Sequence, residues 1–139
     1  MNAVDTNVLV YSFDQLEPGK RAKARALLSQ LGQTGDLPRL LWQVAGELLS
    51  CLARWESSGR IQPAETIAIL NHVLGLMPLA MPMTSVLTRA IEMRGRHSLS
   101  HWDSMLLAAC VEAGIDTLYS EDLTSGMTYD TVKVINPFV

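Results

Sequence analysis

Apolar and polar residues follow one another along this chain with two different periods, which predict helices and short strands in alternation. Apolar positions that recur every three or four residues are typical of amphipathic helices, and short apolar runs between turn residues are typical of buried strands. We expect helices over residues 7–13, 19–31, 43–57, 63–75, 84–96 and 101–113. We expect strands over residues 2–5, 39–42, 79–81, 117–119 and 131–135.

Strands that alternate with helices imply right-handed crossovers, and such crossovers produce a parallel sheet with helices on both faces. The expected fold class is therefore α/β, a three-layer α/β/α sandwich with a central parallel sheet. Four helices show a face that we expect to pack inward. These faces are Ala22, Ala26, Leu27 and Leu31; Val44, Leu48, Cys51 and Trp55; Ile67, Leu70 and Leu74; and Leu106, Leu107, Cys110 and Val111.

The composition indicates one globular domain over residues 1–139, because 48% of the residues are hydrophobic, only 18% are charged, and no linker or repeat divides the chain. The longest apolar stretch, Val73–Met83, holds two prolines and is too short to span a bilayer. The net charge of −3 excludes a generally basic nucleic-acid coat. Two cysteines are too few for a disulfide scaffold, which favours a soluble protein of the reducing cytoplasm.

Four carboxylates occupy positions that need an explanation. Asp5 and Asp122 each follow a predicted strand, where ligands bind in open α/β sheets. Glu47 and Asp103 lie on the apolar side of a helix, close to its first turn. Each acid has a structural interpretation of its own: Asp5 as a helix N-cap, Glu47 in an ion pair with Arg54 or Arg89, Asp103 in a capping box with Ser100, and Asp122 as a solvated loop acid.

A shared cause explains all four positions together. Parallel strands place Asp5 and Asp122 at one edge of the sheet, and the helices that carry Glu47 and Asp103 begin at that edge. Two carboxylates about 5 Å apart repel each other by roughly 3 kcal/mol at an effective dielectric constant of 20. A divalent cation removes this repulsion, and oxygen ligands without cysteine or histidine favour Mg²⁺ or Mn²⁺. Such an ion can activate water and polarise a phosphodiester.

Five short stretches support this interpretation from one end of the chain to the other. They are Val4-Asp5-Thr6-Asn7-Val8-Leu9, Gly46-Glu47-Leu48, Asp103-Ser104 ahead of Met105–Ala109, Leu118-Tyr119-Ser120-Glu121-Asp122-Leu123, and Val132–Phe138. In their order and spacing they resemble the PIN-domain ribonucleases, and most closely the VapC-like toxins of bacterial toxin–antitoxin pairs.

The resemblance implies an endoribonuclease that depends on Mg²⁺ or Mn²⁺, together with an RNA substrate, a cognate antitoxin and a homodimer. The family's acids map onto Asp5, Asp103 and Asp122 as metal ligands, and onto Glu47 as a ligand or as the group that orients the attacking water. By the same resemblance Thr6, Asn7 and Ser120 support the site: Asn7 would position the first carboxylate, and Ser120 would form a hydrogen bond near the metal. Whether Glu121 joins the site is left open.

Other residues with possible chemistry have two interpretations or a structural one. Arg89, Arg94 and Arg96 form the densest basic run and either contact RNA phosphates or make a solvated helix face. We interpret the basic residues Lys20, Arg21, Lys23 and Arg25 as a solvated face, and Cys51 and Cys110 as core residues. His97 and His101 are four residues apart, but a helix start between them argues against a zinc site.

Three functions compete with a toxin ribonuclease. A PIN-type nuclease of RNA processing would use the same residues, and a non-catalytic binding module would retain the acids for folding or partner recognition. Aspartyl phosphoryl transfer with Asp5 as the nucleophile is disfavoured, because the haloacid-dehalogenase pattern needs a second aspartate where this chain has Asn7.

Overall fold

A computed structural model of the chain describes residues 1–139. Every predicted helix and strand is present within a few residues of its expected bounds, and one additional strand, β5, is formed. In chain order the elements are β1 (Asn2–Val4), α1 (Thr6–Phe13), α2 (Pro18–Gln33), β2 (Leu40–Leu41), α3 (Trp42–Ser57), α4 (Pro63–Leu76), β3 (Leu79–Ala80), α5 (Ser85–His97), α6 (His101–Glu112), β4 (Thr117–Tyr119), β5 (Thr128–Tyr129) and β6 (Val132–Ile135).

The main sheet has the strand order β1-β4-β6-β5, in which β1, β4 and β6 are parallel and β5 runs antiparallel to β6. Val4 pairs with Tyr119, which in turn pairs with Ile135, so the parallel strands end together. We call this the carboxyl edge, and the edge where β4 and β6 begin the amino edge. β2 and β3 form a second, parallel sheet that a bridge between Ala3 and Arg39 joins to β1.

The apolar pattern did not predict β5, because this strand contains no apolar run: its two residues are the exposed Thr128 and the buried Tyr129. A turn at Asp130, with a φ of 54°, returns the chain to β6. Aspartate is one of the few residues that adopts this left-handed conformation readily. The sheet is therefore mostly parallel, with one antiparallel strand at its margin.

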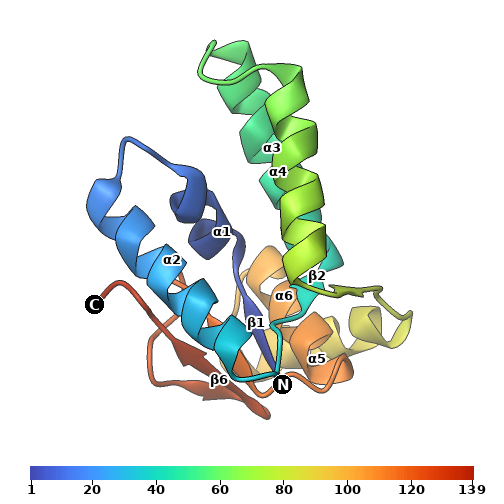
Figure 1. Ribbon diagram of the computed structural model, residues 1–139. Helices are drawn as coiled ribbons and strands as arrows, with labels where there is room; N and C mark the ends of the chain where they lie inside the picture. Colours follow the sequence, from blue (N-terminus) through green and yellow to red (C-terminus); the bar gives the residue numbers. More distant parts are fainter.

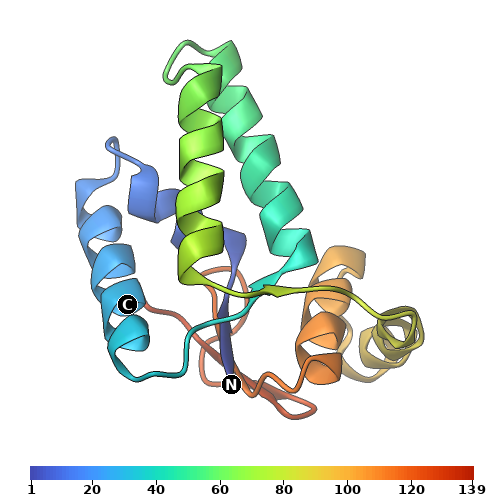
Figure 2. The same cartoon turned by 45° about the vertical axis from the view of Figure 1, so that its right-hand side comes forward.

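Helices cover both faces of the main sheet, as the α/β/α sandwich requires. α1 packs on α2 on one side of the sheet, and α5 packs on α6 on the other (Figure 1). α3 and α4 form a hairpin that extends beyond the carboxyl edge (Figure 2). The first turns of α3 and α6 start at this edge, which is what brings residues from four segments together. None of the helices combines the length and the apolar character needed to cross a bilayer.

The inward faces of α3 and α6 agree with the sequence analysis. Val44, Leu48 and Cys51 are buried on α3, and Leu106 and Cys110 are buried on α6. All of these except Cys51 belong to one continuous core with the parallel strands. Burial of apolar surface of this kind is the main favourable contribution to folding.

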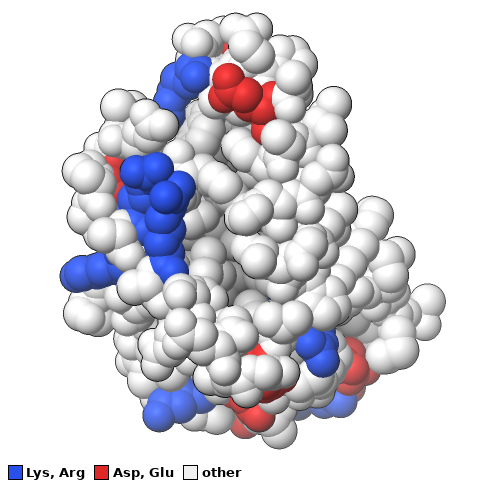
Figure 3. Space-filling view, viewed as in Figure 1, with Lys and Arg blue, Asp and Glu red and all other residues white.

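The expected inward faces of α2 and α4 were wrong in part. On α2 the buried residues include Ala24, whereas Ala22 and Ala26 are exposed. On α4 Val73 is buried, whereas the predicted Ile67 and Leu74 are 63% and 42% exposed. Apolar residues surround α4, so its sequence does not define one inward face, and the middle of its outer surface shows no charged side chain (Figure 3).

Candidate active site

The centre of the site is formed where β1 and β4 end side by side. Val4 pairs with Tyr119, so the next residues, Asp5 and Ser120, leave the sheet together. The Asp5 backbone N–H donates to the Tyr119 carbonyl at 2.9 Å, which extends the ladder by one bond. The Ser120 hydroxyl then donates to Asp5 Oδ2 at 2.7 Å. The pairing register of two strands thus places a hydroxyl against the first carboxylate.

Asp5 is also the N-cap of α1, because its Oδ1 accepts the Thr6 backbone N–H at 2.7 Å. The interpretation of Asp5 as an N-cap is correct. Asp5 is also buried, however, and burying an ionised carboxylate costs free energy. Burial raises the pKa of Asp5, and the negative charges of Asp122 and Glu47 raise it further, against the lowering effect of the bonds from Ser120 and Thr6. Ionising Asp5 therefore costs more free energy in the folded protein than in water, and a nearby cation would offset that cost.

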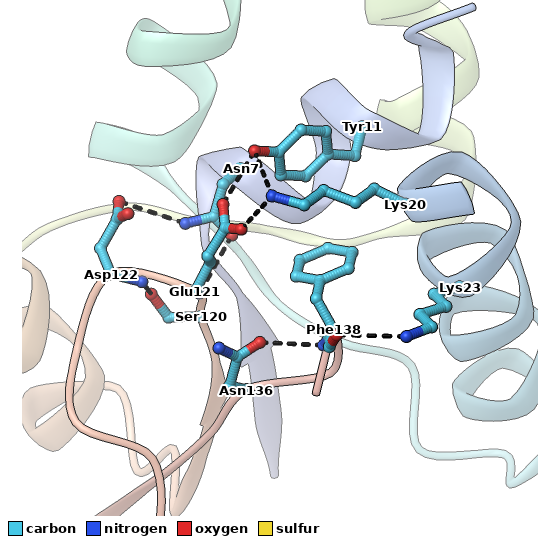
Figure 4. A network of polar contacts seen from close by, with 9 residues as sticks. All are labelled: Asn7, Tyr11, Lys20, Lys23, Ser120, Glu121, Asp122, Asn136 and Phe138. Carbon is cyan, nitrogen blue, oxygen red and sulfur yellow. Dashed lines mark hydrogen bonds and ion pairs between the residues drawn. The ribbon is translucent and has the colours of Figure 1, made fainter. Parts of the chain in front are cut away.

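Asn7 joins α1 to the turn that carries Asp122. Its Nδ2 donates to Asp122 Oδ2 at 3.2 Å, and its Oδ1 accepts the backbone N–H of Glu121 at 3.4 Å (Figure 4). The Asp122 backbone N–H donates to the Ser120 hydroxyl at 3.1 Å, so Ser120 contacts both acids through one oxygen. The sequence analysis placed Asn7 next to the first carboxylate, whereas the structure bonds it to the last one.

Glu47 faces the same centre from the second turn of α3. Its two oxygens accept hydrogen bonds from the Thr6 hydroxyl at 2.6 Å and from Gln43 Nε2 at 3.0 Å. Glu47 was expected on the apolar, inward side of its helix, but it is exposed. At about 100° per residue, Glu47 lies roughly 60° to one side of Val44, and the buried face of α3 lies to the other side, toward Leu52.

Asp103 lies in the first turn of α6, half-buried, where its backbone N–H donates to the capping Ser100 hydroxyl at 3.3 Å. Its carboxylate takes no part in the hydrogen bonds through Thr6, Asn7 and Ser120 that join the other three acids. The link between α3 and α6 is Gln43, whose Nε2 also donates to the Trp102 carbonyl at 3.3 Å. Gln43 was missed from the sequence, although a Gln-to-Glu spacing of four residues on a helix is a recognisable side-chain pair.

None of the four acids has a cation within 4.0 Å, although seven other acidic side chains of the chain do. The ion pair of Glu47 with Arg54 or Arg89, which the sequence allowed, is not formed. Asp5, Glu47 and Asp122 are instead joined through neutral donors. Carboxylates that share neutral donors still repel one another, so the protein itself leaves their charge uncompensated.

The residues present are suited to an ion that keeps several of its waters, such as Mg²⁺, and do not form a cage of protein ligands. No three Asp, Glu, His or Cys side chains converge closely enough to enclose a metal on their own. Mg²⁺ keeps several waters and uses one or two protein carboxylates, so separated oxygen donors suit it. Cys110 lies in the core, as expected, whereas Cys51 is largely buried but lines the groove beside Glu47.

The basic run of α5 does not flank these acids. Arg96 and His97 bind the Asp130 carboxylate, and Arg89 binds Glu112 at the end of α6 at 3.4 Å. Asp130 immediately precedes β6 and Glu112 ends α6, so these contacts lie at the amino edge, across the sheet from Asp5. His97 is held by Asp130, whereas His101 packs edge to face against Trp102, so the two imidazoles have different partners.

A different arginine adjoins the acids. Arg54 lines a groove of about 360 Å³ together with Thr6, Asn7 and Glu47, and no carboxylate lies within 4.0 Å of its guanidinium group. Its only side-chain contact is a bond to the Ser50 hydroxyl at 3.3 Å, one turn earlier on α3. The spacing of seven residues between Glu47 and Arg54 on a helix could have suggested this shared face.

Comparisons with known proteins agree with this geometry. Among solved structures, VapC20 from Mycobacterium tuberculosis, a sarcin–ricin loop cleaving toxin, matches with a TM-score of 0.60 over 88% of this chain and 90% of its own. The sequence identity is 19%, so this likeness shows a common fold. A search of curated protein sequences found no significant match. A sequence model of the PIN domain matches residues 3–124, a range that includes all four acids. The chain therefore belongs to the PIN-domain family.

Proposed function

We propose that this protein is a divalent-metal-dependent endoribonuclease and the toxin of a toxin–antitoxin pair. The observation that carries the proposal is the contrast in charge compensation: none of the four acids at the carboxyl edge has a cation, whereas seven of the ten other acids of the chain do. PIN-domain proteins are nucleases, which supports a hydrolase. The toxin role rests on the likeness to VapC20, a toxin that cleaves the sarcin–ricin loop.

Asp5, Asp103 and Asp122 would hold Mg²⁺ or Mn²⁺, and the bound ion would supply a polarised phosphodiester and an acidified water. Glu47 would ligate the ion or accept the proton of the attacking water. Thr6 holds Glu47 through its hydroxyl, and Asn7 and Ser120 hold Asp122 and Asp5. The chain needs no covalent nucleophile in this reaction, because water attacks the phosphorus.

The RNA backbone would follow the groove beside Glu47, where Arg54 is free to bind a phosphate. An uncompensated guanidinium group next to an acidic site offsets the repulsion that a polyanionic substrate meets there. Arg89, Arg94 and Arg96 are less suited to this contact, because two of them bind acids at the opposite edge.

The test is cleavage of RNA by the purified protein with Mg²⁺, with Mn²⁺ and with a chelator. We expect cleavage only with metal, and a loss of more than about 100-fold in Asp5→Asn and Asp103→Asn, each folded by circular dichroism. Glu65→Gln, an exposed acid in the first turn of α4, is the matched control. Cleavage by either aspartate variant at the wild-type rate would remove that residue from the site.

A binding module would cut no RNA with or without metal, and neutralising its acids should stabilise the fold. Cleavage by the wild type therefore separates the two functions, because Asp5→Asn should stabilise a metal-free nuclease as well. Sequencing of RNA ends after controlled expression of the wild type and of Asp5→Asn identifies the substrate. Growth arrest on expression, and a small antitoxin gene next to this one, separate a toxin of the cytoplasm from a nuclease of RNA processing. Sedimentation at micromolar concentration tests the expected homodimer.

A further inference from the structure

A fifth acid lies beside the site and is bound by side chains that the proposed reaction does not use. The Glu121 carboxylate accepts a hydrogen bond from the Tyr11 hydroxyl at 2.9 Å and forms an ion pair with Lys20. Lys20 Nζ also donates to the Tyr11 hydroxyl at 3.1 Å. The sequence analysis assigned Lys20 to a solvated helix face, whereas it closes a three-membered network between α1, α2 and the turn after β4 (Figure 4). We call Tyr11, Lys20 and Glu121 the clamp.

Aromatic contacts hold the lysine of the clamp in place. Lys20 Nζ lies 4.6 Å from the centroid of the Tyr11 ring and 5.8 Å from that of Phe138. The two rings pack edge to face with centroids 5.1 Å apart. Cation–π contacts and the ion pair therefore fix the same ammonium group from two directions.

The clamp and Asn7 hold the two ends of one short turn. Asn7 and Tyr11 are four residues apart on α1 and so share a helix face. Asn7 binds Asp122 and the backbone of Glu121, and Tyr11 binds the Glu121 side chain. Consequently the carboxylates of Glu121 and Asp122 are held apart, on either side of the Asn7 side chain (Figure 4). Without the clamp, a loose fifth carboxylate could approach the acids at the carboxyl edge, and Asp122 would lose a fixed neighbour.

We propose that Lys20 and Tyr11 are positioning residues, which bind Glu121 outside the acidic site and thereby hold Asp122 in the orientation in which it ligates the metal. This inference rests on the proposed function. Lys20 touches neither Asp5 nor Asp122, so it acts through the turn. Residues that orient a metal ligand commonly change metal affinity by 10-fold to 100-fold when they are removed.

The test uses a variant that cuts the clamp without changing the net charge. Lys20→Met/Glu121→Gln removes one positive and one negative group, so the long-range attraction for a cation is unchanged. Arg96→Met/Asp130→Asn removes a comparable ion pair at the amino edge and is the matched control. Mn²⁺ affinity is measured by isothermal titration calorimetry, thermal stability by scanning calorimetry, and RNA cleavage as kcat and KM.

We expect the clamp variant to bind Mn²⁺ about tenfold more weakly than the wild type, with a matching fall in kcat. The control pair should keep wild-type Mn²⁺ affinity even if its melting temperature falls as much. In an Asp122→Asn background the clamp variant should cause no further loss, because the clamp acts through Asp122. Should the double variant fail to fold, Tyr11→Phe removes only the hydroxyl and should weaken Mn²⁺ binding a few-fold.

Wild-type Mn²⁺ affinity in the clamp variant or in Tyr11→Phe would overturn the inference, as would an equal loss with and without Asp122. In either case the wild type would still bind Mn²⁺ and cleave RNA, so the proposed function would stand. If the wild type itself neither binds Mn²⁺ nor cleaves RNA, the proposed function fails and the inference fails with it.

Discussion

Acidic side chains at the two edges of the main sheet have different hydrogen-bond donors: charged groups at the amino edge and neutral groups at the carboxyl edge. At the amino edge Asp130 accepts hydrogen bonds from both Arg96 and His97. At the carboxyl edge Asp5 has only a hydroxyl and a backbone N–H as donors. Both carboxylates are largely removed from solvent, so the difference lies in their partners. The charge of Asp130 is compensated by basic side chains of the chain itself, whereas no basic side chain pairs with Asp5.

The pKa values of these two acids move in opposite directions for this reason. Burial raises the pKa of each carboxyl group. For Asp130 the hydrogen bonds from His97 and Arg96 outweigh burial, and the pKa falls below its usual range. For Asp5 burial prevails, and the nearby charges of Asp122 and Glu47 add to it, so the pKa rises. An acid kept at such a cost, in a crevice of the sheet, is typical of a functional site.

The largest expected effect compares a single amide substitution at each edge. Asp122→Asn should lower RNA cleavage by more than about 100-fold, because it removes a proposed metal ligand. Asp130→Asn should leave cleavage within about twofold and should lower the free energy of unfolding by about 1 kcal/mol, because its partner Arg96 is half-exposed and screened. Initial rates measure RNA cleavage, and urea unfolding measures the free energy of unfolding. A large loss of cleavage in Asp130→Asn would show that the two edges are coupled.

An intermediate effect compares one arginine at each edge. Arg54→Gln should weaken RNA binding by about fivefold in chelator, and should lower the slope of log affinity against log salt by about 0.7, the value for one phosphate contact on a single strand. Arg96→Gln removes the same charge at the amino edge and should change neither quantity beyond the error of measurement. Fluorescence anisotropy at several salt concentrations gives both values. Equal losses in the two variants would indicate non-specific attraction.

The smallest effect concerns stability and its pH dependence. Because the pKa of Asp5 is raised on folding, its ionisation costs stability as the pH rises above the usual aspartate pKa of about 4. Asp5→Asn keeps a good N-cap and removes this cost. In chelator its melting temperature should therefore exceed that of the wild type by a few degrees at neutral pH, and the gap should close toward pH 4.

The difference in melting temperature between Asp130→Asn and the wild type should have the opposite sign to that of Asp5→Asn. The pKa of Asp130 is lowered on folding, so this carboxylate stabilises the protein above about pH 4 and the contribution is lost as the pH falls through the lowered value. The variant should melt below the wild type at neutral pH and approach it in acid. Scanning calorimetry from pH 4 to pH 8 compares the two variants, and gaps of the same sign would refute the contrast between the edges.

The order of the elements and the position of Asp5 and Asp122 at the carboxyl edge could be predicted from the sequence. Asp5 and Asp122 follow strands, and parallel pairing brings the ends of strands together whatever the details of packing. The prediction did less well for residues whose surroundings come from a second element. Glu47 lies beside the buried residues of α3 around the helix axis. Whether it is itself buried depends on how α3 packs on the rest of the fold, which its own sequence does not specify.

The basic residues show the same limit more clearly. In the densest basic run, on α5, Arg89 and Arg96 bind acids at the opposite edge, while Lys20 of α2 pairs with Glu121 and Arg54 of α3 lines the groove with Glu47. The density of basic residues shows where positive charges occur along the sequence. It does not show which acids they pair with, because these ion pairs join segments that are far apart in the sequence. Lys20 and Glu121 are 101 positions apart, and no local pattern connects them.

By itself the sequence determined the alternation of helices and strands, the parallel sheet and the set of acids at its edge, because periodicity and strand direction are local properties that the backbone must obey. Only the tertiary structure decided which acids are compensated, which face of α4 is covered and which cation approaches the site. These depend on contacts between distant segments, and the energy of a charge is set by the groups packed around it in space.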